Sequence, residues 1–398
     1  MVPEDPFHPD FRANPYPLYH YMRSMAPVHR TIYGWLLTRD ADCRQVLSQE
    51  GRFSHDFANN AYYRRWEAEG WQPGPLHSFL SGTLTYQDAP RHTRTRELLT
   101  AALARRPFDS LQASIDDHVG RLLDLAMQTG EVDVIRDFAY PLPLAVAGEW
   151  LGIPSEDVHL VREWTARLTP VIDPLEVRQT EVQCMAAELR LLEYLSALID
   201  YRRSHPRPDL LSALLEVEVG GERMSSWYVA TTCMFLLVAA HDFTVNLVGN
   251  GILGLLMNPD QMEMLRQNPQ LAPSAVEEIL RYDSPLQLSS RSTMEAVEVG
   301  GVSIGEGEDV ILVLGAANRD PARFRDPDRF DICRDATGHL AFTDGPHTCL
   351  GAPLARSIGA VAIRDVALKL PGLKLASAEP QWAASVARRG LTSLAVTL

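Results

Sequence analysis

Apolar residues recur at intervals of three and four along much of this 398-residue chain. Residues at this spacing share one face of a helix, so the pattern predicts amphipathic helices over residues 90–104, 114–128, 184–204 and 272–282. A longer apolar run extends from Trp227 to Leu256 and contains no proline. The chain is therefore predicted to be mostly helical.

The apolar run from Trp227 to Leu256 is long enough to raise the question of a membrane span. Four polar residues fall in its middle: His241, Asp242, Asn246 and Asn250. Hydrocarbon penalises such groups heavily, so we interpret the run as a buried helix and expect no membrane association.

Strand patterns are few and short. They occupy residues 28–38, 296–304, 309–316 and 391–398, and they predict a small sheet region beside the helical bulk. Residues 317–334, dense in Asp-Pro and Arg, predict irregular chain. Residues 54–87 are predicted to be a loop that covers something apolar, because aromatic residues are frequent there, among them Phe57, Tyr62, Tyr63, Trp66, Trp71 and Phe79.

Composition narrows the classes of protein that fit this pattern. No linker or repeat interrupts the chain, so residues 1–398 are predicted to form a single domain. A net charge of −14 argues against a nucleic-acid surface, which needs clustered Lys and Arg. The first residues lack the basic start and apolar centre of a signal peptide, which predicts a cytoplasmic protein. Five widely spaced cysteines without a CxxC pair argue against a disulfide framework.

One cysteine stands in a chemically suggestive place. In "HLAFTDGPHTCLGAPLAR" (339–356), Cys349 directly precedes a helical pattern, where the helix dipole and free backbone N–H groups stabilise a thiolate. It could be a metal ligand or a nucleophile, or simply a buried structural cysteine. His339 and His347 lie near it in sequence, but the missing fourth ligand makes zinc a poor fit.

Three other patterns are weak when taken singly. Glu278 and Arg281 are three apart on one helix and close enough to pair, as many solvated helix residues are. His92 and Arg96 share one helix face and could hold a carboxylate from two points, or could belong to an exposed basic helix start. Arg291 is an isolated cation between apolar stretches.

The combination is far more specific than its parts. An HxxxR helix start, an acid in a long apolar helix, an ExxR helix and the loop FxxGxHxCxG (342–351) occur in one order along the chain. In this order the chain resembles the cytochrome P450 family, the haem-thiolate monooxygenases, and specifically its soluble bacterial members. The resemblance implies a mainly α fold with a small β region and a long central helix over the haem.

The resemblance also implies a cofactor, haem b (iron protoporphyrin IX), and the residues that hold it. Cys349 would be the thiolate ligand of the haem iron. His92, Arg96, Arg291 and His347 would hold the two haem propionates. Glu278 and Arg281 would be a buried structural ion pair.

Asp242 occupies the position of the family's acid, which is expected to relay protons during oxygen activation. The next residue in most relatives is a threonine, but here it is Phe243, and the hydroxyl stands at Thr244. Thr244 is rotated by about 100° along the helix and cannot take the same place. A substrate hydroxyl or a water could restore the relay, Phe243 could shape a pocket for chemistry without oxygen insertion, or peroxide could be the oxidant. Alternatively, Phe243 could face away and merely pack; we favour the first interpretation because Asp242 is present.

The implied function is hydroxylation or epoxidation of a hydrophobic natural product, polyketide- or terpenoid-like, in secondary metabolism. The alternative is oxidative cyclisation, coupling or desaturation without net oxygen insertion. No flavin or nicotinamide fingerprint is present, so electrons are expected from a ferredoxin and its ferredoxin reductase. We hypothesise that an acidic donor meets Arg91, Arg94, Arg105 and Arg106. The predicted substrate pocket comprises Phe243, Thr244, Leu286, Leu288, Leu391 and Thr392.

Overall fold

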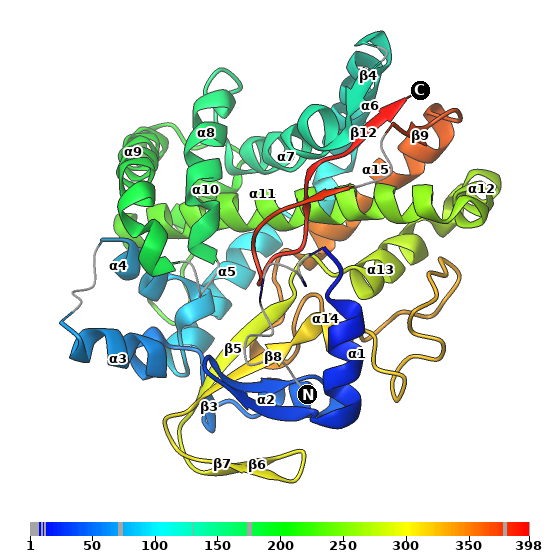
Figure 1. Cartoon of the computed structure of the whole chain (residues 1–398). Coiled ribbons are helices and arrows are strands. Elements are labelled where there is room, and N and C mark those ends of the chain that lie inside the picture. Colours follow the sequence, from blue (N-terminus) through cyan, green and yellow to red (C-terminus); the bar gives the residue numbers. More distant parts are fainter. Residues whose placement is uncertain are drawn as a thin grey trace. The chain divides into compact units, whose positions relative to one another are not determined.

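The computed structural model describes residues 8, 11, 13–70, 75–129, 131–172, 177–376 and 380–397. Most of these residues are helical, and the strands are short (Figure 1). The chain divides into two compact units. Unit 1 comprises residues 1–64, 119–140 and 243–398, and unit 2 comprises residues 65–118 and 141–242. The helices α3 (Ala61–Ala68), α6 (Gln112–Thr129) and α11 (Ser226–Met257) contribute residues to both units.

The largest sheet lies in unit 1 and has five strands in the order β1-β2-β8-β5-β3. Only β2 and β8 are parallel to each other. The fully buried pattern of β8 reflects its central place, since both of its faces are covered. The strands are β1 (Val28–Thr31), β2 (Gly34–Leu37), β3 (Phe53–Ser54), β5 (Leu288–Thr293) and β8 (Asp309–Val313).

Three smaller sheets also belong to unit 1. The strand β12 (Ala395–Thr397) lies between β4 (Glu131–Asp133) and β9 (Lys374–Leu375), so the end of the chain pairs with a distant segment (Figure 1). The other two are hairpin-like pairs, β6 (Val297–Val299) with β7 (Val302–Ile304), and β10 (Gln381–Trp382) with β11 (Leu391–Ser393).

The helices of unit 1 bury their apolar faces against this sheet and against each other. In α13 (Ala272–Tyr282), Val276, Ile279 and Leu280 are buried, as the spacing of an amphipathic helix requires. The remaining helices are α1 (Tyr16–Met25), α2 (Asp40–Ser48), α12 (Pro259–Gln267), α14 (Leu314–Ala317) and α15 (Ala352–Lys369).

Among the described residues of unit 2, the regular elements are helices, and one isolated bridge joins Val219 to Glu222. A buried ion pair joins Arg202 to Asp209, whose oxygen lies 2.8 Å from Arg202 Nε, and Arg202 also donates to the carbonyl of Gly152. This pair ties the end of one helix to the start of another and to a turn. The helices are α4 (Pro75–Gly82), α5 (Arg91–Arg105), α7 (Pro141–Leu151), α8 (Val158–Leu168), α9 (Val177–Ser204) and α10 (Leu210–Glu216).

The four helices predicted from periodicity are confirmed as α5, α6, α9 and α13, and the long apolar run is confirmed as α11. The strand predictions are confirmed except at the end of residues 309–316, where β8 gives way to α14. Residues 318–334 form turns and bends, as predicted, but Ala317, the first residue of the predicted irregular range, belongs to α14.

The prediction of a loop over residues 54–87 is wrong, because this segment contains α3 and α4. Each helix has only eight residues, too few to show a helical period clearly. Phe57, Tyr63 and Phe79 are buried. Trp71 lies outside the described residues, and so do the side chains of Tyr62 and Trp66.

Helix α11 is long and apolar enough to cross a membrane by length and composition, and it is the one such helix among the described residues. However, 67% of its most apolar window is buried inside the protein. A buried core helix meets the same criterion, and this finding agrees with the interpretation of the run as a buried helix.

Candidate functional site

Cys349 lies in an ordered turn directly before α15. Its backbone N–H donates to the carbonyl oxygen of Phe342 at 3.0 Å, which closes the loop between them. Its side chain is exposed, and the helix begins after Gly351. The loop therefore presents a thiol at the positive end of a helix, where the dipole favours a negative charge.

Two residues of this loop have left-handed backbone. Gly345 has φ +69°, and a Cβ atom there would overlap the backbone carbonyl oxygen of Leu47, so the position requires glycine. Thr343 has φ 59°, a conformation that is costly for a β-branched residue. Its hydroxyl donates to the carbonyl of His347 at 3.0 Å, a bond that offsets part of this cost.

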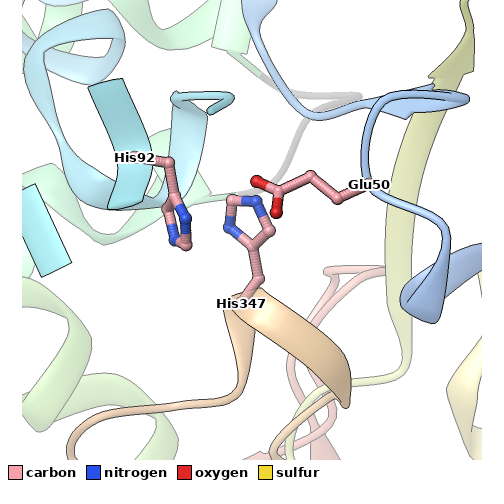
Figure 2. Close-up of side chains that lie close together, drawn as sticks. All are labelled: Glu50, His92 and His347. Carbon is pink, nitrogen blue, oxygen red and sulfur yellow. The ribbon is translucent and has the colours of Figure 1, made fainter. Parts of the chain in front are cut away.

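His347 extends from the short turn Gly345–His347 towards residues that follow α2. An oxygen of Glu50 lies within 4.8 Å of a His347 ring nitrogen, and Figure 2 shows the carboxylate directed at the imidazole. His55 packs edge-on against the same ring, with 5.3 Å between centroids. Glu50 and His55 were not predicted from the sequence, since neither belongs to a motif and both are almost 300 positions from His347.

Arg291 lies on β5 and is only 4% exposed. Its guanidinium donates to the hydroxyl of Ser289 at 3.1 Å and to the carbonyl of Ser290 at 2.6 Å. A guanidinium has five N–H donors in a planar fork, a geometry that matches a carboxylate. A buried cation of this kind suits an anionic ligand.

In unit 2, His92 and Arg96 lie on the first turns of α5 (Figure 2 labels His92). His92 is 1% exposed and Arg96 is half-buried, so the interpretation as an exposed basic helix start does not describe them. On the same helix Arg94 pairs with Glu222, and Arg105 pairs with Glu216 at 3.4 Å. Half of the hypothesised donor-binding charges are thus locally balanced.

Helix α11 is buried from Val229 to Leu253 except along one stripe. The stripe repeats every three to four residues, so it marks one face of the helix. Thr244 lies outside it and is 5% exposed. The partly exposed residues of the stripe are Phe235, Leu236, Ala239, Ala240, Asp242 and Phe243.

Asp242 and its neighbour His241 have opposite surroundings. His241 is 2% exposed, and burial, together with the charge of Arg162, lowers its pKa to about 4. It is therefore neutral at neutral pH. Asp242 instead belongs to the partly exposed stripe, which makes it the acid available to a ligand on that face.

The predicted pocket residues outside α11 all lie in unit 1. Leu288 on β5 and Leu391 on β11 are both 5% exposed, and Leu286 is partly exposed. Thr392 is exposed, and its hydroxyl donates to the carbonyl of Gln381 at 3.2 Å. Successive side chains of a strand point to opposite faces, so Leu391 and Thr392 lie on opposite faces of β11.

The ion pair predicted from the ExxR pattern is confirmed. Glu278 and Arg281 are both fully buried, with 2.7 Å between Arg281 Nε and the carboxylate. Arg281 also donates to the carbonyls of Asn318 and Pro327, and Arg334 lies 3.3 Å from Glu278. The pair ties α13 to the irregular chain that precedes the Cys349 loop.

Within unit 1, Cys349, His347 and Arg291 fit a ligand that carries a metal and carboxylates. The Cys349 thiol is accessible, and the cations are partly or wholly buried. The stripe on α11 offers apolar surface with a single acid. Iron protoporphyrin has this combination of a metal, an apolar face and two propionates.

Comparison with known proteins decides the family. The family model for Cytochrome P450 matches residues 183–364. The chain is 41% identical over 376 residues to Cytochrome P450 107B1 of Saccharopolyspora erythraea. This alignment covers 92% of this chain and 90% of that protein. The chain belongs to the cytochrome P450 family.

Cytochrome P450 monooxygenase PikC of Streptomyces venezuelae is 38% identical to this P450 over 398 residues, 97% of this chain and 92% of that protein. Among solved structures, the cytochrome P450 PksS of the Bacillus subtilis bacillaene polyketide synthase gives a TM-score of 0.89 at 34% identity, and covers 99% of each chain. The predicted fold is therefore confirmed, and this P450 is a haem b monooxygenase, an oxidoreductase.

Proposed function

We propose that this P450 hydroxylates or epoxidises a hydrophobic natural product of polyketide or terpenoid type, with dioxygen and electrons from a ferredoxin and its reductase. The stripe on α11 carries the proposal, because its apolar side chains and single acid suit a large, mostly apolar substrate. Two relatives support it: PksS belongs to a polyketide synthase, and another relative, 34% identical, is 6-deoxyerythronolide B hydroxylase.

Each site residue has a proposed task. When bound, haem supplies the iron centre at which dioxygen is activated for transfer of one oxygen atom to the substrate. Cys349 would hold the iron as a thiolate. Arg291 and His347 would neutralise propionates, as would His92 and Arg96, because buried carboxylates need such partners.

Asp242 would move a proton from solvent towards the reacting oxygen, the work of a general acid. Phe243, its partly exposed neighbour, would shape the substrate position instead of supplying a hydroxyl. Thr244, buried and off the stripe, is poorly placed to replace that hydroxyl. A substrate hydroxyl or a water would then complete the proton path.

Two measurements test the proposal. In the first, candidate macrolactones and terpenoids are screened for the shift of the haem absorption spectrum that substrate binding causes. In the second, the masses of products formed under isotopically labelled dioxygen are measured. Products that gain one labelled oxygen support it. Binding only of small charged molecules would exclude the substrate class. Oxidised products that contain no added oxygen would establish oxidative cyclisation, coupling or desaturation, the alternative that Phe243 raises.

Phe243→Thr tests the role of position 243. If a substrate hydroxyl or water already completes the proton path, product formed per NADPH consumed should rise or stay level, because the added hydroxyl only supplements the path. Val245→Thr, at a buried position of the same helix, is the control for general disturbance of α11. Collapse of turnover in Phe243→Thr with normal haem ligation would instead make Phe243 an essential shaping residue.

A further inference from the structure

A second acid of α13, next to the ExxR glutamate, occupies an unusual position. Glu277 Oε1 accepts from Arg356 Nε at 2.6 Å, and its Oε2 accepts from Arg356 Nη2 at 3.0 Å. Its Oε2 also lies 3.3 Å from His339 Nε2. One carboxylate thus holds two cationic or donor side chains from different places in the chain.

The two partners of Glu277 mark the two ends of the Cys349 loop. His339 precedes the loop, and Arg356 lies on the first turns of α15, which follows it. The backbone N–H of Ala341 donates to His339 Nδ1 at 3.1 Å, so a neutral His339 carries its proton on Nε2, facing Glu277. His339 has a side chain only 2% exposed, so its orientation is fixed by packing as well.

The same cluster reaches the backbone of Cys349 through Phe342. The Arg356 guanidinium carbon lies 4.6 Å from the centroid of the Phe342 ring, a cation–π contact, and the His339 ring lies 5.8 Å from it. The carbonyl oxygen of Phe342 is the acceptor for the Cys349 N–H. Glu277 therefore orients the two side chains that hold Phe342, and Phe342 holds Cys349.

The charge of Glu277 is stabilised by this arrangement. Burial alone would raise its pKa, but the interactions with His339 and Arg356 outweigh burial and lower the pKa to about 2. At neutral pH the carboxylate is therefore ionised, and its bidentate bond to Arg356 is charge-assisted.

We propose that Glu277 is a positioning residue for the haem thiolate: its carboxylate fastens both ends of the Cys349 loop and so keeps the cysteine in the geometry that ligates iron. Two neighbouring carboxylates of α13, Glu278 and Glu277, then bind two different segments. The first carboxylate holds the irregular chain, and the second holds the cysteine loop. The proposal rests on Cys349 being the iron ligand.

The test compares Glu277→Gln and Glu277→Ala with a matched control, Asp365→Asn. Asp365 lies on α15, pairs with Arg364 Nε at 2.7 Å, and has a side chain 11% exposed against 19% for Glu277. It follows Arg356 by nine residues, or about 14 Å along the helix. The control thus breaks a similar carboxylate pair away from the loop.

The readouts are the carbon monoxide difference spectrum of the reduced protein, the haem reduction potential and Tm. The spectrum gives the ratio of two forms of the protein, the form that lacks thiolate ligation of the haem and the form that has it. We expect Glu277→Ala to raise this ratio about tenfold, which corresponds to about 1.4 kcal/mol. Glu277→Gln keeps one acceptor oxygen and should lie between wild type and Glu277→Ala. Asp365→Asn should lower Tm without changing the ratio or the potential.

An unchanged ratio and potential in both Glu277 variants would overturn the proposal, whatever happens to Tm. An equal change of ratio in Asp365→Asn would overturn it too, because the effect would then reflect general loss of stability. Cys349→Ala separates the underlying assumption from the proposal. If that variant kept the thiolate-type spectrum, Cys349 would not be the ligand.

Discussion

At the scale of single residues, the Cys349 loop depends on backbone conformation as much as on side chains. Gly345 and Thr343 both have positive φ, and they differ in what makes this tolerable. Gly345 lacks the Cβ that would meet Leu47, whereas Thr343 gains a hydrogen bond to His347. A loop position with left-handed backbone can therefore accept threonine.

Gly345→Ala should destabilise this P450 by clearly more than the about 1–2 kcal/mol that left-handed backbone costs an alanine. The excess arises from overlap of the new Cβ with the backbone carbonyl of Leu47. Urea unfolding of the haem-loaded protein measures it.

Gly301→Ala is the control for this prediction. Gly301 has φ +80° and nothing within 4 Å of the Cβ position, so only the backbone cost applies. Equal losses in the two variants would show that the contact with Leu47 is unimportant.

At the scale of elements, α13 is the helix that organises the chain before α15. Its Glu278–Arg281 pair is fully buried and bonded to carbonyls of the irregular segment, while Glu277 faces the cysteine loop. A buried pair is strongly destabilised when one partner is removed, because the other charge remains unpaired. An exposed pair has no such penalty.

Arg281→Met should therefore lower the free energy of unfolding by about 3–5 kcal/mol. Glu163→Gln on α8 breaks an exposed pair with Arg167 and should cost about 0.5 kcal/mol or less. Thermal or urea unfolding of both variants checks the contrast. Similar small losses in both would contradict a structural role for the buried pair.

The lowered pKa of Glu277 predicts a pH dependence of stability. A depressed folded-state pKa means that the stabilisation is complete above the ordinary value of 4.5 and is lost as pH falls towards about 2. At neutral pH the free energy of unfolding of the wild type should exceed that of Glu277→Gln by on the order of 2 kcal/mol. This difference in free energy should shrink below pH 4.5. Urea unfolding across this range measures it, and a constant difference would argue against the ionised pair.

At the scale of the whole molecule, the net charge of −14 opposes the approach of an acidic electron donor. A cationic area must offset this repulsion if such a donor is used. Arg94 and Arg105 are already paired with glutamates, which makes Arg91 and Arg106 the sharper candidates for donor contact.

Arg91→Glu combined with Arg106→Glu should therefore slow reduction by an acidic ferredoxin at least severalfold at low salt, and the loss should diminish as salt increases. Stopped-flow reduction measures the rate. Arg167→Glu with Arg223→Glu changes the net charge equally and is the control. If the control slowed reduction as much, net charge and not a local surface would govern the donor's approach.

The sequence by itself determined the features that depend on neighbours along the chain. Periodicity identified α5, α6, α9 and α13, a long apolar run identified α11, and the order of motifs identified the family, because helices and tight loops are built from local spacing. The short helices α3 and α4 were not predicted from the sequence, because eight residues complete only about two turns and show little periodicity.

Only the tertiary structure decided which distant residues meet. It brought Arg356 to Glu277 across 79 positions and Glu50 to His347 across almost 300. It also placed Asp242 and Phe243 on the partly exposed stripe of α11 but left His241 buried. No local pattern encodes these outcomes, because each follows from how separate elements pack, and packing decides which polar side chains find partners and which remain accessible to a ligand.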